Sequence, residues 1–196
     1  MRKITSLTPK QGNIARSNRL SGVLAAGFLT IVIAPPVAAD DATFATRLVG
    51  YQETPLTINS AGSGEFKAKI RDDGTAIDYE LTYRDLSSAI TQSHIHFGRP
   101  ALTGGVVLFL CTNLGNAPAS VPTPQVCPAA PATITGSLTA ANVVAVPGQG
   151  IDAGAAGFAE MLKAIRAGAA YTNVHTTGHP SGEIRGRLHS HESDEH

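Results

Sequence analysis

Two short stretches of the chain place histidines at spacings that could hold a metal ion. His94 and His96 lie two residues apart in the first stretch, and His175 lies in the second, within residues 171–186. On a β-strand, residues i and i+2 point to the same face, about 6.6 Å apart along the backbone. Two such imidazoles can share one ion, and a third would complete a three-nitrogen site of the kind that copper or zinc accepts.

A fourth histidine, His179, follows in a turn rich in glycine, proline and serine. It is a weaker candidate ligand, because a turn does not define the direction of its side chain. A His-x-His pattern is also short enough to fit imidazoles that hydrogen-bond backbone groups of neighbouring loops. The sequence therefore leaves open whether His94, His96 and His175 bind a metal or hold the hairpin in place.

Glu183 and Arg185 flank Ile184 and would share one face of a strand. They could form a local ion pair, or the carboxylate could orient an imidazole, as groups around metal ligands do. A simple surface pair is the third interpretation. The sequence contains no serine nucleophile elbow, phosphate loop, zincin helix or cysteine–histidine nucleophile arrangement. We therefore assign no catalytic residue.

The elements that would position these residues are mostly strands. Alternating apolar residues and turn signals predict them over residues 43–49, 64–70, 75–83, 93–97, 133–138 and 184–188, with another beginning at Tyr171. Asp72-Asp73-Gly74 predicts a tight turn between the second and third. Residues 106–110 form a continuous apolar run, which predicts a central strand buried on both faces.

One helix is expected before the second histidine stretch. Phe158, Met161, Leu162 and Ile165 recur at helical spacing and make one apolar stripe, which is typical of core packing. Asp152, upstream of the stripe, is a candidate cap, and Gly168, after the last turn, is a candidate C-cap in the left-handed conformation. Short strands with a single helix predict a mainly β fold, an antiparallel sandwich or barrel.

The chain has two cysteines, Cys111 and Cys127, which border a proline-rich stretch expected to be a loop. In an oxidising compartment they would form a disulfide, worth about 3 kcal/mol for a loop of this size. A pair of thiolate metal ligands is the alternative.

The first 39 residues have the pattern of a signal peptide. Basic residues precede a short apolar run, and Val37-Ala38-Ala39 is a small-residue cleavage signal, so the mature chain would begin at Asp40. An uncleaved membrane anchor is the alternative, although the apolar run is short for one. We expect an exported protein, periplasmic or secreted, with no stable membrane anchor after cleavage.

Cleavage would change the charge balance. The chain has 15 basic and 15 acidic residues, and the leader takes five basic and no acidic ones, so the remainder has a net charge of −5. This balance does not favour nucleic acid or an anionic membrane surface as a partner. The expected organisation is a signal peptide over residues 1–39, one domain over 40–189, and a polar, histidine-rich tail over 190–196.

The domain resembles the CHRD family, named for chordin. The resemblance is carried by Gln52-Glu53-Thr54-Pro55, by residues 93–98, and by residues 171–176 with 180–186, and it covers about residues 42–189. It implies an immunoglobulin-like β-barrel with limited similarity to copper/zinc superoxide dismutase. Under that similarity, His94, His96 and His175 correspond to copper ligands.

The dismutase similarity is incomplete. No histidine lies between Phe97 and Val174, so the bridging imidazole and the zinc-binding loop are missing. We therefore do not expect dismutase activity. The leading interpretation is a non-enzymatic binding or structural module whose partner is an unknown extracytoplasmic protein or small ligand. The alternative is a copper- or zinc-binding protein. A third possibility, a hydrolase, would require a polar pocket with perturbed carboxylates.

Overall fold

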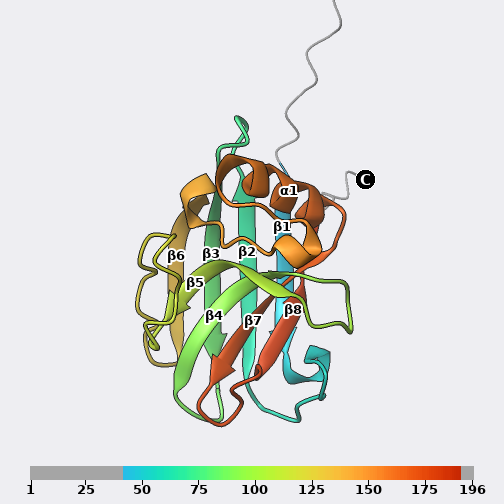
Figure 1. Ribbon diagram of the computed structural model, residues 1–196. Helices are drawn as coiled ribbons and strands as arrows, with labels where there is room; N and C mark the ends of the chain where they lie inside the picture. The colour runs from blue at the N-terminus through green and yellow to red at the C-terminus, as the bar shows by residue number, and fades with distance from the viewer. Residues whose placement is uncertain (1–41, 191–196) are drawn as a thin grey trace, which may run out of the picture. The chain divides into compact units, whose positions relative to one another are not determined.

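The computed structural model describes residues 42–190, and the elements appear in Figure 1. The strands are β1 (Thr43–Val49), β2 (Ser63–Ile70), β3 (Ala76–Arg84), β4 (Ile90–Phe97), β5 (Gly105–Thr112), β6 (Ala132–Thr139), β7 (Ala170–Thr176), β8 (Ile184–Arg187) and β9 (His189–Ser190). The helix is α1 (Gly154–Arg166), and short 3-10 turns are η1 (Gly50–Gln52), η2 (Ala140–Asn142) and η3 (Pro147–Gln149).

The strands form one antiparallel sheet in the order β5-β4-β7-β8-β1-β2-β3-β6, with β9 also paired to β1. The sheet curls so that β4 and β5 lie across β2 and β3, which nearly closes a barrel (Figure 1). The hydroxyl of Tyr79 on β3 donates to the carbonyl of Leu110 on β5 at 2.9 Å, so the two sides of the barrel are also joined through its interior. The predicted mainly β fold with one helix is confirmed.

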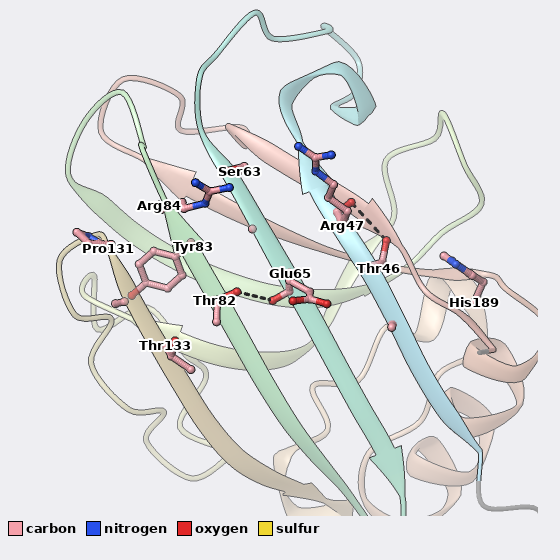
Figure 2. A pocket seen from close by; sticks show the side chains of 13 residues that line it. Thr46, Arg47, Ser63, Glu65, Thr82, Tyr83, Arg84, Pro131, Thr133 and His189 are labelled. Atoms are coloured by element: carbon pink, nitrogen blue, oxygen red, sulfur yellow. Dashed lines mark hydrogen bonds between the residues drawn. The ribbon is translucent and has the colours of Figure 1, made fainter. Parts of the chain in front are cut away.

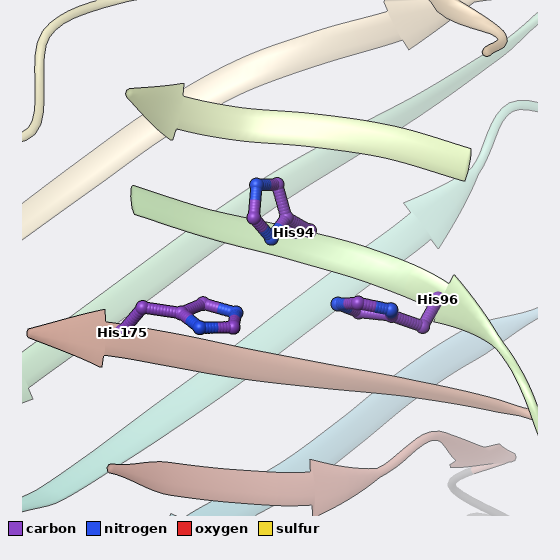
Figure 3. Close-up of side chains that lie close together, drawn as sticks. All are labelled: His94, His96 and His175. Carbon is purple, nitrogen blue, oxygen red and sulfur yellow. The ribbon is translucent and has the colours of Figure 1, made fainter. Parts of the chain in front are cut away.

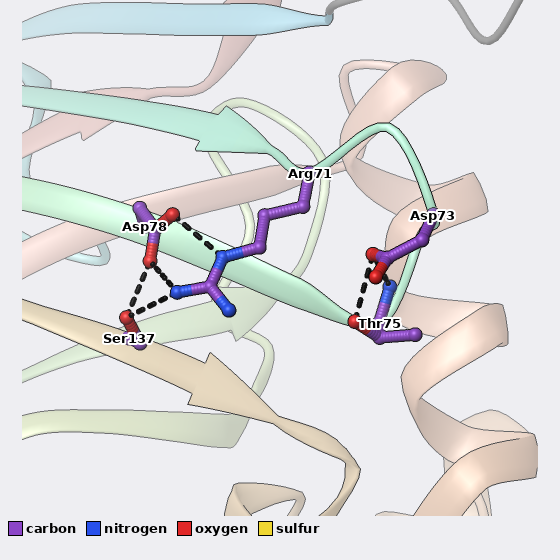
Figure 4. Close-up of polar contacts among 5 residues, drawn as sticks. All are labelled: Arg71, Asp73, Thr75, Asp78 and Ser137. Carbon is purple, nitrogen blue, oxygen red and sulfur yellow. Dashed lines mark hydrogen bonds and ion pairs between the residues drawn. The ribbon is translucent and has the colours of Figure 1, made fainter.

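The predicted hairpin of β2 and β3 is confirmed. Gly74 adopts φ +66°, and Asp73 accepts hydrogen bonds from the backbone and hydroxyl of Thr75 at 2.9 and 2.7 Å. Beside the turn, Arg71 binds both carboxylate oxygens of Asp78 at 2.8 Å, and Asp78 also accepts from Ser137 (Figure 4). These bonds lower the pKa of Asp78 to about 2, with the Arg71 bond as the largest cause.

The apolar run at residues 106–110 was predicted to be a central strand, and this is wrong. It lies in β5, which is at one end of the strand order. The apolar run resembles that of a central strand because both faces of β5 are covered, although the strand lies at the end of the order. Leu108 and Leu110 belong to the core, while the ring of Phe109 packs edge-on against His94, with centroids 4.5 Å apart.

The helix α1 crosses one end of the barrel (Figure 1). Its predicted stripe is confirmed, because Phe158, Met161, Leu162 and Ile165 are all buried in the core. Burying each such side chain stabilises the fold by about 1.5–3 kcal/mol. Gly168 ends the helix with φ +63°, as predicted. The cap predicted at Asp152 is not observed, because the helix begins after Ala153 without a side-chain hydrogen bond.

The predicted disulfide is confirmed, since Cys111 and Cys127 are bonded, and this excludes the thiolate-ligand alternative. The bond fixes the loop after β5, where the Asn113 amide also donates to the carbonyls of Ile90 and Cys127. Both cysteines are buried, so the disulfide forms part of the core.

The leader predicted over residues 1–39 and the start at Asp40 lie outside the described residues, as does most of the tail. At the other end, the sheet continues one residue beyond the domain boundary predicted at 189, because His189 and Ser190 pair with Ala45 and Phe44 of β1. Within residues 42–190, no helix has the length and apolar character needed to cross a membrane.

Candidate metal centre

The three histidines predicted to converge do meet. The neighbouring strands β4 and β7 are antiparallel, and their register places His94 opposite Asn173 and His96 opposite Tyr171. Ile95 and Val174 point to the core, so the histidines lie on the other face of the sheet. One ring nitrogen from each of His94, His96 and His175 lies within 4.8 Å of the others (Figure 3).

Loops cover this face, so all three imidazoles are buried, with exposed fractions of 2% for His94, 6% for His96 and 7% for His175. Burial is the main cause that lowers the pKa of His94 to about 2 and of His96 to about 4, and it also lowers the pKa of His175. The rings are therefore neutral at pH 7. Neutral imidazoles carry the nitrogen lone pair that a metal requires.

Two of the rings are fixed by backbone carbonyls. Nδ1 of His96 lies 3.0 Å from the oxygen of Gly104, and Nδ1 of His175 lies 2.9 Å from the oxygen of Pro180. A carbonyl can only accept, so these bonds place the proton of each neutral ring on Nδ1 and leave a lone pair on Nε2. The interpretation that imidazoles hold neighbouring loops is thus confirmed for these two. The same bonds orient them as ligands.

His94 has no such partner. Both of its ring nitrogens are buried and make no hydrogen bond within the described part of the chain. Its ring is enclosed by aromatic groups, with centroids 4.5 Å from Phe109, 5.1 Å from His175 and 5.4 Å from His96. A buried polar group without a partner costs about 1–3 kcal/mol, which is unusual unless something else binds it.

Asn173 is a member of the cluster that the sequence reasoning missed. Its Oδ1 lies 3.0 Å from Nε2 of His96 and 3.0 Å from Nε2 of His175. The signal was available, because Asn173 is two residues before His175 on the same strand and must share its face.

A stack of three groups supports His96. The ring of Tyr171 lies parallel to the imidazole of His96, and the guanidinium carbon of Arg185 lies 3.4 Å from the centroid of the Tyr171 ring. Arg185 also donates to Thr54 Oγ1 and to the carbonyls of Arg99 and Leu102. It therefore ties the loop after β4 to the ring that stacks on His96.

Glu183 was predicted to pair with Arg185 or orient an imidazole, and the structure places it elsewhere. Its buried carboxylate accepts from Ser60 Oγ at 2.5 Å, from Ser87 N and Oγ at 2.7 and 2.9 Å, and from Thr176 Oγ1 at 2.7 Å. Burial acts to raise its pKa, but these hydrogen bonds together lower it. Glu183 thus joins two loops to the end of β7.

Glu53 is a second group that the sequence reasoning did not single out. It is 4% exposed, and burial raises its pKa to about 7 against opposing effects from Thr54, Arg185 and a hydrogen bond with the Asn173 side chain. Gly182 allows it to sit there, because a Cβ on Gly182 would lie 2.5 Å from Glu53 Oε1.

His179 does not join the cluster. It lies half-buried in the turn after β7, and its backbone N–H donates to Thr176 O and Oγ1, each at 3.2 Å. The group of histidine and acidic side chains that could hold a metal contains only His94, His96 and His175 within residues 42–190.

Hollows lie on the surface of the described part of the chain. One, of about 920 Å³, runs over the strands β1, β2, β3 and β6 and is flanked by Arg47 and Arg84 (Figure 2). Another, of about 460 Å³, includes Glu53 and Arg185 in its lining. Neither is lined by the three histidines, so the centre is covered rather than open to these hollows.

Comparison with known families supports the resemblance. The family model described as the CHRD domain matches residues 44–188, a range that includes every residue of the centre. No curated protein and no solved structure matches the chain.

Proposed function

The chain belongs to the CHRD domain family, and we propose that it acts as a metal-binding module that holds one copper or zinc ion through His94, His96 and His175. Imidazole nitrogen is a ligand that both metals accept. We propose export as well, which the buried disulfide supports because such bonds persist in oxidising compartments.

The observation that carries the metal proposal is the unpartnered ring of His94. The rings of His96 and His175 are fixed by carbonyls, so their Nε2 lone pairs face the cluster. In the ring of His94, neither nitrogen makes a hydrogen bond within the described residues. A structural role alone would leave this cost uncompensated. An ion bound to one of the two nitrogens would satisfy that nitrogen directly.

Binding would contract the cluster. Ligands 2.0–2.1 Å from a tetrahedral ion are about 3.4 Å apart, whereas the three nitrogens lie within 4.8 Å of one another. The carbonyl-bonded rings of His96 and His175 are the more constrained, so His94 is expected to move toward them. The buried position favours holding the ion over turning over a substrate, and this agrees with a binding or structural module.

The test is metal analysis of the full chain, expressed with its leader and without a tag, with His191 and His196 replaced by Ser to remove tail binding. We expect about one copper or zinc per chain after dialysis against a weak chelator. His94→Ala and His175→Ala should abolish it, and His179→Ala, the matched control, should retain it. A metal-free wild-type chain with native circular dichroism would refute the proposal.

The export proposal has its own test. N-terminal sequencing of protein recovered from the host's periplasm or medium should begin at Asp40. Protein that stays in the cytoplasm with residue 1 intact would refute it.

A further inference from the structure

We infer that the amide oxygen of Asn173 is a fourth ligand, so that the centre is a closed site of three nitrogens and one oxygen for a zinc-type divalent ion. This inference rests on the proposed metal binding and specifies its coordination. Asn173 lies in the same stretch as His175, residues 171–176, and its place beside the imidazoles comes from the geometry of β7.

The atoms that meet Asn173 Oδ1 carry lone pairs and no hydrogen. Nε2 of His96 and of His175 are acceptors, because each ring's proton is on Nδ1. Oδ1 of Asn173 is also an acceptor, yet it lies 3.0 Å from both nitrogens. Three electron-rich atoms therefore face one another without a hydrogen between them. A cation between them turns this repulsion into attraction.

The spacing also fits coordination. Two ligand atoms that are 3.0 Å apart, each about 2.0–2.1 Å from an ion, subtend about 95° at it. This is a compressed tetrahedral angle, which zinc tolerates because it has no electronic preference for one geometry. Oδ1 can thus share an ion with both Nε2 atoms with little movement.

The oxygen end of the Asn173 amide faces the rings. When Glu53 is ionised, only the NH₂ group of the Asn173 side chain can donate a hydrogen bond to it. The opposite orientation would then turn Oδ1 toward a carboxylate, where two acceptors would repel. Glu53 is itself held in place between Thr54 N–H, at 3.4 Å, and Gly182. Glu53 is therefore a positioning residue for Oδ1.

The donor set selects the ion. Four protein ligands complete the tetrahedral shell that zinc takes in structural sites, and burial of all three imidazoles leaves no position for a substrate. A carbonyl oxygen is a hard ligand and suits a divalent ion better than copper(I), which prefers softer donors. The ion would link β4 and β7 and, through the carbonyls of Gly104 and Pro180, two loops.

The test compares zinc affinity, by competition with a chromophoric chelator, in the wild type, Asn173→Ala and Asn173→Asp. Loss of the oxygen ligand should weaken binding at least tenfold. Asn173→Asp, which keeps an oxygen in place, should restore it. Asn59→Ala, at an exposed asparagine that accepts from Tyr51, is the matched control and should bind as the wild type does.

A second readout asks whether a coordination position is open. With cobalt(II) in place of zinc, added azide should leave the visible spectrum of the wild type unchanged and alter that of Asn173→Ala. Circular dichroism of the metal-free variants checks folding. If the wild type binds zinc but responds to azide, and Asn173→Ala keeps full affinity, this inference fails while the three-histidine proposal stands. If the wild type binds no metal, the proposed function itself fails.

Discussion

The ring of Tyr171 lies parallel to the imidazole of His96, with their planes 7° apart and their centroids 4.6 Å apart. The contact is made possible by the register of β4 and β7, which places these two residues directly opposite each other. The hydroxyl of Tyr171 accepts from the N–H of Gly104, whose carbonyl meets Nδ1 of the same imidazole. His96 is thus held from its flat face and from its edge.

Removing the stack should loosen this ligand. We expect Tyr171→Leu to weaken metal binding about tenfold, because His96 can then rotate away from its productive orientation. Tyr171→Phe keeps the ring and should lose much less. Competition titration measures both, and equal affinity for Tyr171→Leu and wild type would show that the stack does not orient His96.

Replacing His94 with an apolar residue should raise the stability of the metal-free protein and abolish metal binding. His94→Leu replaces an imidazole that has two unpartnered nitrogens with an apolar group that fits beside Phe109. We expect the metal-free protein to become more stable by about 1–3 kcal/mol, while metal binding disappears. Urea denaturation in the presence of a strong chelator measures the first effect. A less stable metal-free variant would mean that the imidazole makes favourable interactions of its own.

The metal-free protein should lose stability in mild acid. The unfolded histidines titrate near 6.5, whereas the folded pKa is lowered to about 4 for His96 and about 2 for His94. Below pH 6.5 the unfolded state binds more protons, so stability falls as pH drops toward 4, by up to about 1.4 kcal/mol per pH unit for each histidine.

Glu53 acts in the opposite direction. Its pKa is raised from 4.5 to about 7 in the folded state, so between these two pH values the folded state binds more protons than the unfolded state. The stability that Glu53 contributes through this proton is lost as pH rises from 4.5 to about 7. The combined effect of the three histidines on the pH dependence of stability is larger than that of Glu53. Urea midpoints measured from pH 7 to pH 5 should therefore decrease, and less steeply in His94→Leu. A midpoint independent of pH would contradict the lowered histidine pKa values.

The buried carboxylate of Glu183 should be important for stability. Glu183→Gln places an NH₂ group where hydroxyl and N–H donors of Ser60, Ser87 and Thr176 converge, so at least one donor loses its acceptor. We expect a loss of about 2–4 kcal/mol in the free energy of unfolding. Glu65→Gln, at an exposed pair with Lys67, should cost under about 1 kcal/mol. Similar losses in both variants would contradict the assignment.

The convergence of the histidines could be predicted because period-two alternation is a local rule. His94 and His96 had to share a face once their stretch was a strand, and the structure confirms this. Their burial could not be predicted, since it depends on loops that meet this face from elsewhere in the chain, where the carbonyls of Gly104 and Pro180 contact two of the rings. Every residue from Ala170 to Thr176 is buried for the same reason, although alternation alone would leave half of them exposed.

The roles of Glu183 and Arg185 were harder to predict. Both lie near the centre in sequence, and a local pattern suggests that they contact each other or His175. Their partners are instead distant in the chain, with Ser60 lying 123 residues from Glu183 and Thr54 lying 131 residues from Arg185. Asn173 was missed for a different reason, because an asparagine in a strand carries no recognisable ligand motif.

The order of strands also determines when the centre can exist. Ser93 on β4 bonds the backbone of Asn173 on β7, and 80 residues separate them. Contacts between such distant segments form late, since the loop between them must close first. A nascent chain therefore carries the pair His94 and His96 without His175, and the set of three imidazoles is incomplete until β7 pairs with β4. Under the proposed metal binding, the ion would be captured by an almost completed barrel, from the supply present where its last strands pair.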